Sequence, residues 1–372
     1  MHICIIAPEQ FPVPGNGSVE ICIWAIARKL ARRHKVTILS RKSPGLPGSV
    51  ELEQVRICRL PSGSPARYEA SVLAFLEKES FDVIQVDNRP LLMAAVKKQH
   101  PRTPVLLFLH SLTFVPAESR IARSLAKADS IALNSRSLQH KLSRRFPGLS
   151  KKLGVIPLGA DLSRFTPAEA AERQRLRKFY RLPPVFTVLF VGRLIPRKGV
   201  PVLIRAIHLL NKRLPAHLII AGHGKPQYVR RLKLMAGRLG VSVSFLGNIN
   251  HEEIHGLYQT ADCFVCPSQR HESFGLVNVE AMASGLPVIA SNNGGIREII
   301  DSGRNGYLVD GYRGAAPFAR NILLIARSPG LAARIGMQGR MDALRTFEWQ
   351  HTAQQLEEHY RSLLPQKHWS QP

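Results

Sequence analysis

The chain has 372 residues, of which 45% are hydrophobic, and its 52 Lys and Arg against 26 Asp and Glu give a net charge of +26. This length predicts two domains, and the composition excludes a disordered or low-complexity protein. Five cysteines, an odd number in a chain this long, argue against a disulfide framework and favour a reducing cytoplasm.

The amino-terminal run "HICIIAPE" has neither the basic leader nor the cleavage site of a signal peptide. Apolar runs such as "PVLLFLH" at Pro104 are shorter than the roughly 18 residues that span a membrane. We therefore expect a cytoplasmic protein, soluble or at most peripheral to a membrane. The positive charge is spread over both halves of the chain, which favours anionic partners such as nucleotide diphosphates, lipid headgroups or nucleic acid.

In chain order, short apolar strands alternate with helical stretches. The first strand patterns are "ICIIA", "KVTILS", "FDVIQV", "PVLLFLH", "DSIALNS" and "LGVIPLG", with a helix over about 19–33. Residues 161–184 are polar and basic, and we interpret them as a linker. Strands then resume with "FTVLFVGR", "HLIIAG", "VSFLG", "DCFVCPS" and "LPVIAS". This β-α-β rhythm predicts an α/β protein with two doubly wound sheets, whose ligands lie beyond the carboxyl ends of the strands.

Two loops of the second half carry charged residues directly after a strand. The loop "GRLIPRKG" places Arg193 and Lys198 before a helix that begins near Gly199, which is typical of a diphosphate site, although an ordinary solvated loop has the same pattern. The stretch "HESFGLVNVEAM" places Glu272 before a helix predicted from about Phe274 and Glu280 about two turns into it.

The two carboxylates have alternative interpretations. Glu280 stands in an apolar run and needs hydrogen-bond donors, which a ribose diol would supply. Glu272, near the free amides of a helix start, would accept hydrogen bonds from sugar hydroxyls. Alternatively, Glu272 caps the helix and Glu280 pairs with a nearby Arg or Lys. Gly285 and Pro287 are predicted to end the helix.

The sequence contains "GRLIPRKG", a spacing of seven residues between Glu272 and Glu280, "PLGADLSRF" at Pro157 and "SNNGGIREIIDSGRNGYLV" at Ser291. Together, these features resemble the retaining GT-B glycosyltransferases of family 4. The resemblance implies two Rossmann-like domains facing a cleft, residues 1–165 on the acceptor side and 166–349 binding the nucleotide sugar. It also implies that a helix over 350–365 returns to the first domain. Locally, "IAPEQFPVPGNGSVE" and "FDVIQVDNRP" are most similar to spore-coat-associated members.

The resemblance also implies roles for individual residues of the second domain. Arg193 and Lys198 correspond to the diphosphate-binding pair, Glu280 to the carboxylate on the nucleotide ribose, and Glu272 to a catalytic residue that contacts the donor sugar. The backbone amides offered to the sugar and phosphate correspond to Phe274, Gly275 and Leu276.

In the first domain, the resemblance assigns His110 to the active site, near the transferred sugar. It assigns Gly15 and Gly17 to a glycine-rich loop over the donor phosphates; Asn16 separates these two glycines, whereas many members have adjacent ones. A satisfied loop histidine and a plain turn are the alternatives.

The sequence has no Asp-x-Asp motif, which disfavours a metal held on the diphosphate. Cys263 and Cys266 form a C-x-x-C in a buried strand pattern, which favours core packing over a metal site. The expected reaction is metal-independent transfer, without a cofactor, from a UDP- or GDP-linked sugar to a glycan, lipid or protein. Retention is implied by the family alone.

Three alternatives stay open: a non-catalytic spore-coat or structural protein, a nucleotide-sugar epimerase, and a nucleic-acid binder, for which no zinc-finger or RNA motif is present. The basic end of the first helix, beside Trp24, also permits peripheral contact with an anionic membrane or the spore coat. A core position for Trp24 is the alternative.

Overall fold

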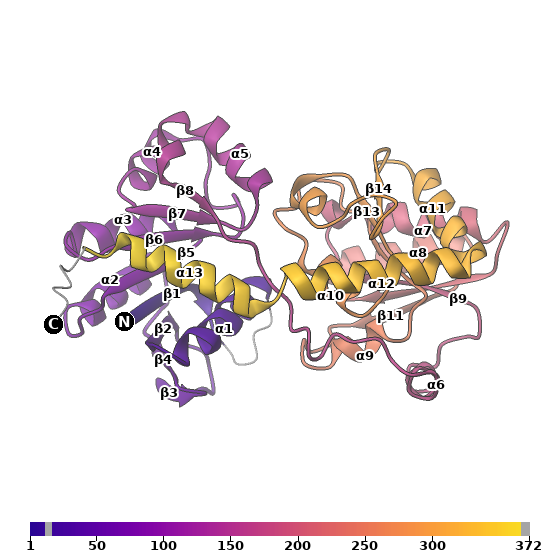
Figure 1. The fold of residues 1–372 in the computed structure, drawn as a ribbon, viewed down its shortest axis with the longest axis horizontal. Coiled ribbons are helices and arrows are strands. Elements are labelled where there is room, and N and C mark those ends of the chain that lie inside the picture. Colours follow the sequence, from indigo (N-terminus) through magenta and orange to yellow (C-terminus); the bar gives the residue numbers. More distant parts are fainter. Residues whose placement is uncertain (12–16, 366–372) are drawn as a thin grey trace. The chain divides into compact units, whose positions relative to one another are not determined.

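The structure is a computed structural model that describes residues 1–11 and 17–365 and contains two compact units. Unit 1 combines Met1–Leu158 with the carboxyl-terminal segment from Trp349, and unit 2 is Gly159–Glu348. Each unit is built on one mostly or wholly parallel sheet with covering helices, so the predicted α/β class with two doubly wound sheets is confirmed (Figure 1).

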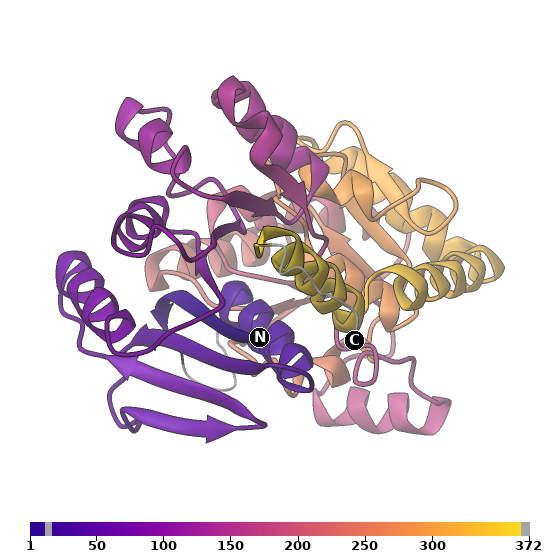
Figure 2. The same ribbon diagram turned by 60° about the vertical axis from the view of Figure 1, so that its left-hand side comes forward.

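The sheet of unit 1 has eight strands in the order β3-β4-β2-β1-β5-β6-β7-β8. All neighbours pair in parallel except β3 and β4, an antiparallel pair at one edge (Figure 2). The strands are β1 (His2–Gln10), β2 (Lys35–Arg41), β3 (Ser49–Leu52), β4 (Val55–Leu60), β5 (Val83–Asp87), β6 (Val105–Leu109), β7 (Ser130–Leu133) and β8 (Leu153–Val155). The helices are α1 (Ser18–Ala31), α2 (Pro65–Leu76), α3 (Pro90–Gln99), α4 (Ser119–Leu125), α5 (Arg136–Arg145), the 3-10 helix η1 (Pro147–Lys152) and α13 (Trp349–Leu363).

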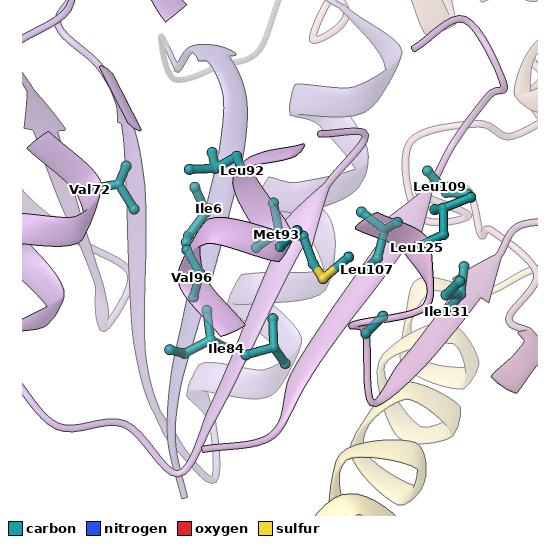
Figure 3. Close-up of a cluster of buried hydrophobic side chains, with 14 of the residues drawn as sticks. Ile6, Val72, Ile84, Leu92, Met93, Val96, Leu107, Leu109, Leu125 and Ile131 are labelled. Atoms are coloured by element: carbon teal, nitrogen blue, oxygen red, sulfur yellow. The ribbon is translucent and has the colours of Figure 1, made fainter. Parts of the chain in front are cut away.

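The core of unit 1 forms where the central strands are covered by helices. Strands β5 and β6 are buried along their whole length, so their sequences do not alternate between apolar and polar residues. β6 is apolar throughout, and β5 is apolar except for Gln85 and Asp87. Figure 3 shows Ile6, Ile84 and Leu107 of the sheet beside Met93 and Val96 of α3, all fully or almost fully buried. Burying each such side chain contributes about 1.5–3 kcal/mol, which fixes the sheet as a rigid base for its loops.

Helix α13 belongs to unit 1, although it follows unit 2 in the sequence. It packs against α1 through one face, on which Trp349, Leu356 and Tyr360 are buried at helical spacing. The Thr352 hydroxyl donates to the carbonyl of Pro157 at 2.8 Å. The chain thus returns to the unit in which it began.

The units divide between Leu158 and Gly159, earlier than the expected boundary at 165. The reason is that the segment after Gly159 packs on unit 2. The Ala160 N–H donates to the Phe347 carbonyl at 2.7 Å, and Phe165 is fully buried with its ring 5.5 Å from that of Tyr258.

The sheet of unit 2 has six parallel strands in the order β11-β10-β9-β12-β13-β14. They are β9 (Phe186–Val191), β10 (Ala216–Ala221), β11 (Val243–Gly247), β12 (Cys263–Cys266), β13 (Val288–Ser291) and β14 (Tyr307–Val309). The helices are α6 (Ala170–Phe179), η2 (Pro196–Lys198), α7 (Val200–Leu210), α8 (Pro226–Arg238), α9 (Ile254–Tyr258), α10 (Leu276–Ala283), η3 (Gly294–Glu298), α11 (Ala315–Arg327) and α12 (Pro329–Thr346). In the described part of the chain, no helix is long and apolar enough to cross a membrane.

Each sheet has a point at which the strand order reverses. In unit 2 the chain runs outward from β9 through β10 and β11, then continues from β12 on the other side of β9. In unit 1 the corresponding neighbours are β1 and β5. Because ligands of open α/β sheets bind at such reversals, beyond the carboxyl ends of the strands, the loops after these four strands are the candidate positions for a site.

Candidate active site

The loops that follow β9 and β12 are in direct contact. Gly199, with φ 77°, lies so close to the β12 loop that a Cβ would be 1.9 Å from the Pro267 carbonyl oxygen. The Gln269 N–H donates to the Arg197 carbonyl at 2.7 Å. A side chain at Gly199 would therefore separate the loops, and this close approach carries Lys198 to the loop that holds Glu272.

Lys198 and Glu272 form an ion pair, with Nζ 2.6 Å from Oε2. The Ser268 hydroxyl donates to the same oxygen at 3.0 Å. Burial by itself would raise the pKa of Glu272, but the charge of Lys198 and the hydrogen bonds from Lys198 and Ser268 outweigh it and hold the pKa below its usual value. Glu272 is thus an ionised acceptor at neutral pH, and the ammonium of Lys198 keeps further N–H donors for a ligand.

The backbone of Glu272 is held by the segment that follows β13. Asn293 accepts from the Glu272 N–H at 3.1 Å and donates to the Ser268 carbonyl at 2.7 Å. Gly295 donates its N–H to the Glu272 carbonyl at 2.8 Å, and a Cβ on Gly294, where φ is 59°, would lie 2.0 Å from that oxygen. In the sequence, this Asn-Asn-Gly-Gly stretch contributed only to the family resemblance; its position directly after a strand was the signal for a role in the site.

Helix α10 begins at Leu276, so the predicted start near Phe274 is wrong. Gly275 has φ 104°, which a right-handed helix does not permit. Within the described residues, the N–H groups of Phe274, Gly275 and Leu276 have no hydrogen-bond acceptor. Free amides at a helix start attract anions, and the family resemblance assigns these three amides to the sugar and phosphate. Gly285, with φ 74°, follows the end of the helix as predicted.

Glu280 lies about one turn into α10, because the helix starts later than predicted, and it is only 3% exposed. Tyr258 donates its hydroxyl to Oε2 at 2.8 Å, and His251 Nε2 lies 2.9 Å from Oε1. The partners are therefore a tyrosine and a histidine rather than the Arg or Lys of the alternative interpretation. Burial, together with Glu280, raises the pKa of Tyr258 and keeps its hydroxyl protonated as a donor.

Glu272 and Glu280 thus belong to two separate hydrogen-bond networks of unit 2. The structure brings Lys198 to Glu272 but does not bring Arg193 to either carboxylate. Arg193 is exposed after β9, and its guanidinium makes no hydrogen bond or ion pair with the described residues. His251, Tyr258, Ser268 and Asn293 were missed from the sequence, because their roles depend on contacts between distant segments.

His110 follows β6 in unit 1 and is 7% exposed. Its Nε2 lies 2.7 Å from Oδ1 of Asp87, and its backbone N–H donates to Asn88 at 2.8 Å. Asp87, fully buried at the end of β5, also accepts from Gln85 at 2.8 Å, and the Tyr360 hydroxyl donates to Gln85 at 2.5 Å. The imidazole is therefore fixed by a buried carboxylate, which the sequence analysis did not identify.

Gly17 is the residue that precedes α1, in an extended conformation with φ −121°. A Cβ there would lie 2.3 Å from Oε2 of Glu20, so the Glu20 side chain folds back over the helix start. Burial raises the pKa of Glu20, and nearby Glu9 adds to this, while the backbone amides of Glu20 and Gly17 act in the opposite direction. Gly15 lies outside the described residues.

Comparisons with known proteins agree with this arrangement of two units. Residues 17–164 match the model of Glycosyltransferase Family 4, and residues 172–342 match that of Glycosyl transferases group 1. Spore coat protein SA of Bacillus subtilis is 32% identical, over 96% of this chain and 98% of its own. The GDP-mannose-dependent alpha-(1-6)-phosphatidylinositol monomannoside mannosyltransferase of Mycolicibacterium smegmatis is 34% identical, over 95% and 97%.

Among solved structures, sucrose-phosphate synthase from Thermosynechococcus elongatus superimposes with a TM-score of 0.83 at 26% identity, over 97% of this chain and 98% of that one. The architecture is therefore GT-B, with two Rossmann-like domains. The matched models and relatives together cover both units. The chain belongs to the glycosyl transferases of group 1, family 4, and is a glycosyltransferase that uses nucleotide sugars.

Proposed function

We propose that this protein is a retaining, metal-independent glycosyltransferase in which unit 2 binds a UDP- or GDP-linked sugar and unit 1 supplies the acceptor side. The observation that carries the proposal is the Lys198–Glu272 pair beside the free amides at the start of α10. It combines a cation and helix amides for the diphosphate with an ionised carboxylate for sugar hydroxyls.

In this proposal, Lys198, Arg193 and the amides of residues 274–276 neutralise the diphosphate as its bond to the anomeric carbon breaks. Arg193 is exposed and unpaired within the described residues, so its guanidinium is available for a phosphate. This fixed positive charge would take the place of a metal ion. A chelator is therefore expected to leave transfer unchanged.

Glu272 and Glu280 have different tasks. Glu272 accepts hydrogen bonds from hydroxyls of the donor sugar and keeps it oriented. Glu280 holds the nucleotide ribose, and the hydrogen bonds from Tyr258 and His251 fix its carboxylate for that contact. Because each carboxylate oxygen has more than one lone pair, these internal bonds leave acceptor capacity for a diol.

Transfer with retention is proposed to proceed by attack on the face that the diphosphate leaves. The bond between the anomeric carbon and the phosphate oxygen breaks, a bond to the acceptor oxygen forms, and the acceptor proton passes to the departing phosphate. His110, held by Asp87, contacts the transferred sugar from unit 1. The anomeric configuration of the product, read by proton NMR, tests retention directly.

The decisive test is a screen of UDP- and GDP-sugars by calorimetry and by release of free nucleoside diphosphate. Wild type is compared with Glu280→Ala and Arg193→Ala, and each protein is assayed with and without a chelator. We expect one sugar nucleotide to bind, and both substitutions to weaken it. If none binds, the catalytic proposal fails and a structural role for the fold replaces it.

The proposed acceptor is a glycan, lipid or protein of the spore coat or cell envelope, a proposal supported by the name of the Bacillus relative.

Peripheral membrane contact would use the basic end of α1. There the guanidinium of Arg28 lies 5.5 Å from the ring of Trp24 and pairs with Glu53, and Trp24 is partly buried. Sedimentation with anionic liposomes tests this contact, and binding that does not depend on salt would contradict it.

A further inference from the structure

A second charged cluster lies at the carboxyl edge of the sheet of unit 1, where its strand order reverses. Glu9 is near the end of β1, Arg41 ends β2, and Arg89 follows β5. One carboxylate oxygen of Glu9 pairs with Arg89, and the other lies 3.7 Å from Arg41. Two guanidinium groups, one at the end of β2 and one in the loop after β5, thus converge on a spot the size of one oxyanion.

The three side chains differ in how firmly they are held. The side chains of Arg41 and Arg89 are 21% and 20% exposed, whereas that of Glu9 is 50% exposed. The Arg89 guanidinium lies 3.8 Å from the ring centre of Phe114, and that of Arg41 lies 5.3 Å from the ring centre of Tyr68. The arginines are therefore fixed by packing, and Glu9 is the partner that can swing away.

This edge also holds polar donors without an acceptor among the residues that the structure describes. Within the described residues, Arg41 Nε, Ser43 Oγ and Arg59 Nε are buried and have no hydrogen-bond acceptor. Arg59 is 6% exposed, and its guanidinium donates to the carbonyls of Phe11 and Pro47 without a carboxylate partner. Because β2 and β4 pair side by side, these donors belong to one edge of the sheet. The edge has more cationic donors than Glu9 can satisfy.

We propose that Arg41 and Arg89 form an oxyanion subsite for the acceptor. The acceptor is then a molecule that carries a phosphate or carboxylate group as well as the hydroxyl that receives the sugar. Glu9 occupies the place of that group until the acceptor displaces it. The inference rests on the proposed function, because it assigns the acceptor to unit 1. A planar guanidinium group can donate two parallel hydrogen bonds to either a phosphate or a carboxylate. Two guanidinium groups directed at one position therefore suit an anionic group, whereas a neutral polyol does not require them.

The test is calorimetry of three matched probes: glucose 6-phosphate, glucuronate and glucose. Each is titrated into the full chain with UDP or GDP present, so that the donor site is filled. At least one charged probe should bind more tightly than glucose. Tighter binding of glucose 6-phosphate would indicate a phosphate on the acceptor, and tighter binding of glucuronate would indicate a carboxylate. Arg89→Gln should weaken that probe by about tenfold or more, because it removes a charged fork. Glu9→Gln should strengthen it by about threefold, because it removes the competing anion.

Arg28→Gln and Glu53→Gln are the matched controls, since they break an exposed ion pair elsewhere on unit 1. Neither should change the affinity of a charged probe. Far-UV circular dichroism checks that each variant is folded, because Arg28 lies 5.5 Å from the ring of Trp24 and its substitution would by itself alter tryptophan fluorescence. If Arg89→Gln does not fold, Arg89→Lys keeps the charge but not the fork and should still weaken the probe.

The inference is overturned if neither charged probe binds more tightly than glucose, or if Glu9→Gln and Arg89→Gln change the affinity in the same direction. Sugar-nucleotide binding is measured on the same preparations. If wild type binds no sugar nucleotide, the result counts against the proposed function. If wild type binds a sugar nucleotide but does not prefer a charged probe to glucose, the result counts against the acceptor subsite alone.

Discussion

Removing the ammonium of Lys198 is expected to lower the free energy of unfolding of unit 2 by about 3 kcal/mol near pH 7. Nζ lies 2.6 Å from Glu272, and the two side chains are 16% and 17% exposed. Removing one partner of a buried pair costs about 3–5 kcal/mol, because the other charge is left uncompensated, and partial exposure places this pair at the lower end. Lys198→Met keeps the apolar stem and removes the charge.

The pH dependence follows from the pKa of Glu272. In wild type the folded-state pKa is depressed, so the stabilisation is complete above the unfolded-state value of about 4.3 and is lost as the pH falls through the lower folded value. In Lys198→Met, burial acts without the opposing charge and raises the folded-state pKa. The variant then takes up a proton at a higher pH, and the difference in stability from wild type should shrink between pH 7 and pH 5.

The assay is urea unfolding followed by far-UV circular dichroism, for wild type, Lys198→Met, Glu272→Gln and the double variant. We expect a coupling energy of about 2 kcal/mol between the two sites at pH 7. Fluorescence of Trp24 and Trp349 gives an internal control, because both lie in unit 1 and residues 159–348 contain no tryptophan. A penalty for Lys198→Met that is equal at pH 5 and pH 7 would refute this account of the pair.

Three further predictions concern other contacts. Tyr360→Phe leaves the buried side-chain carbonyl of Gln85 without its donor and should lower the free energy of unfolding of unit 1 by about 2 kcal/mol. Urea unfolding followed by tryptophan fluorescence measures this, and an unchanged unfolding midpoint would contradict a stabilising role of the bond. Gly294→Ala should weaken donor binding in calorimetry because its Cβ would meet the Glu272 carbonyl, whereas Gly303→Ala, also at positive φ but with no atom within 4 Å, should not. Glu280→Gln should lower donor affinity by about tenfold, because a neutral amide accepts more weakly from a diol; equal affinity would exclude Glu280 from the donor site.

The strands were predictable from the sequence because buried parallel strands are rich in apolar residues. The loops of the site were predictable because charged residues directly after such a strand stand out in the sequence. Its errors were local. The start of α10 was placed too early because the positive φ of Gly275 is not apparent from its neighbours. The unit boundary was placed too late because the contacts of Phe165 with unit 2 are made by residues far along the chain.

The sequence by itself determined the fold class, the family and the identity of the charged residues that follow β9 and β12, since apolar periodicity and motif spacing are properties of local segments. Only the tertiary structure decided which charges meet. It paired Lys198 with Glu272, gave Glu280 to Tyr258 and His251, and held His110 with Asp87. These partners are separated in the chain, and their contact depends on strand order and on close backbone approach at glycines, which no local pattern records.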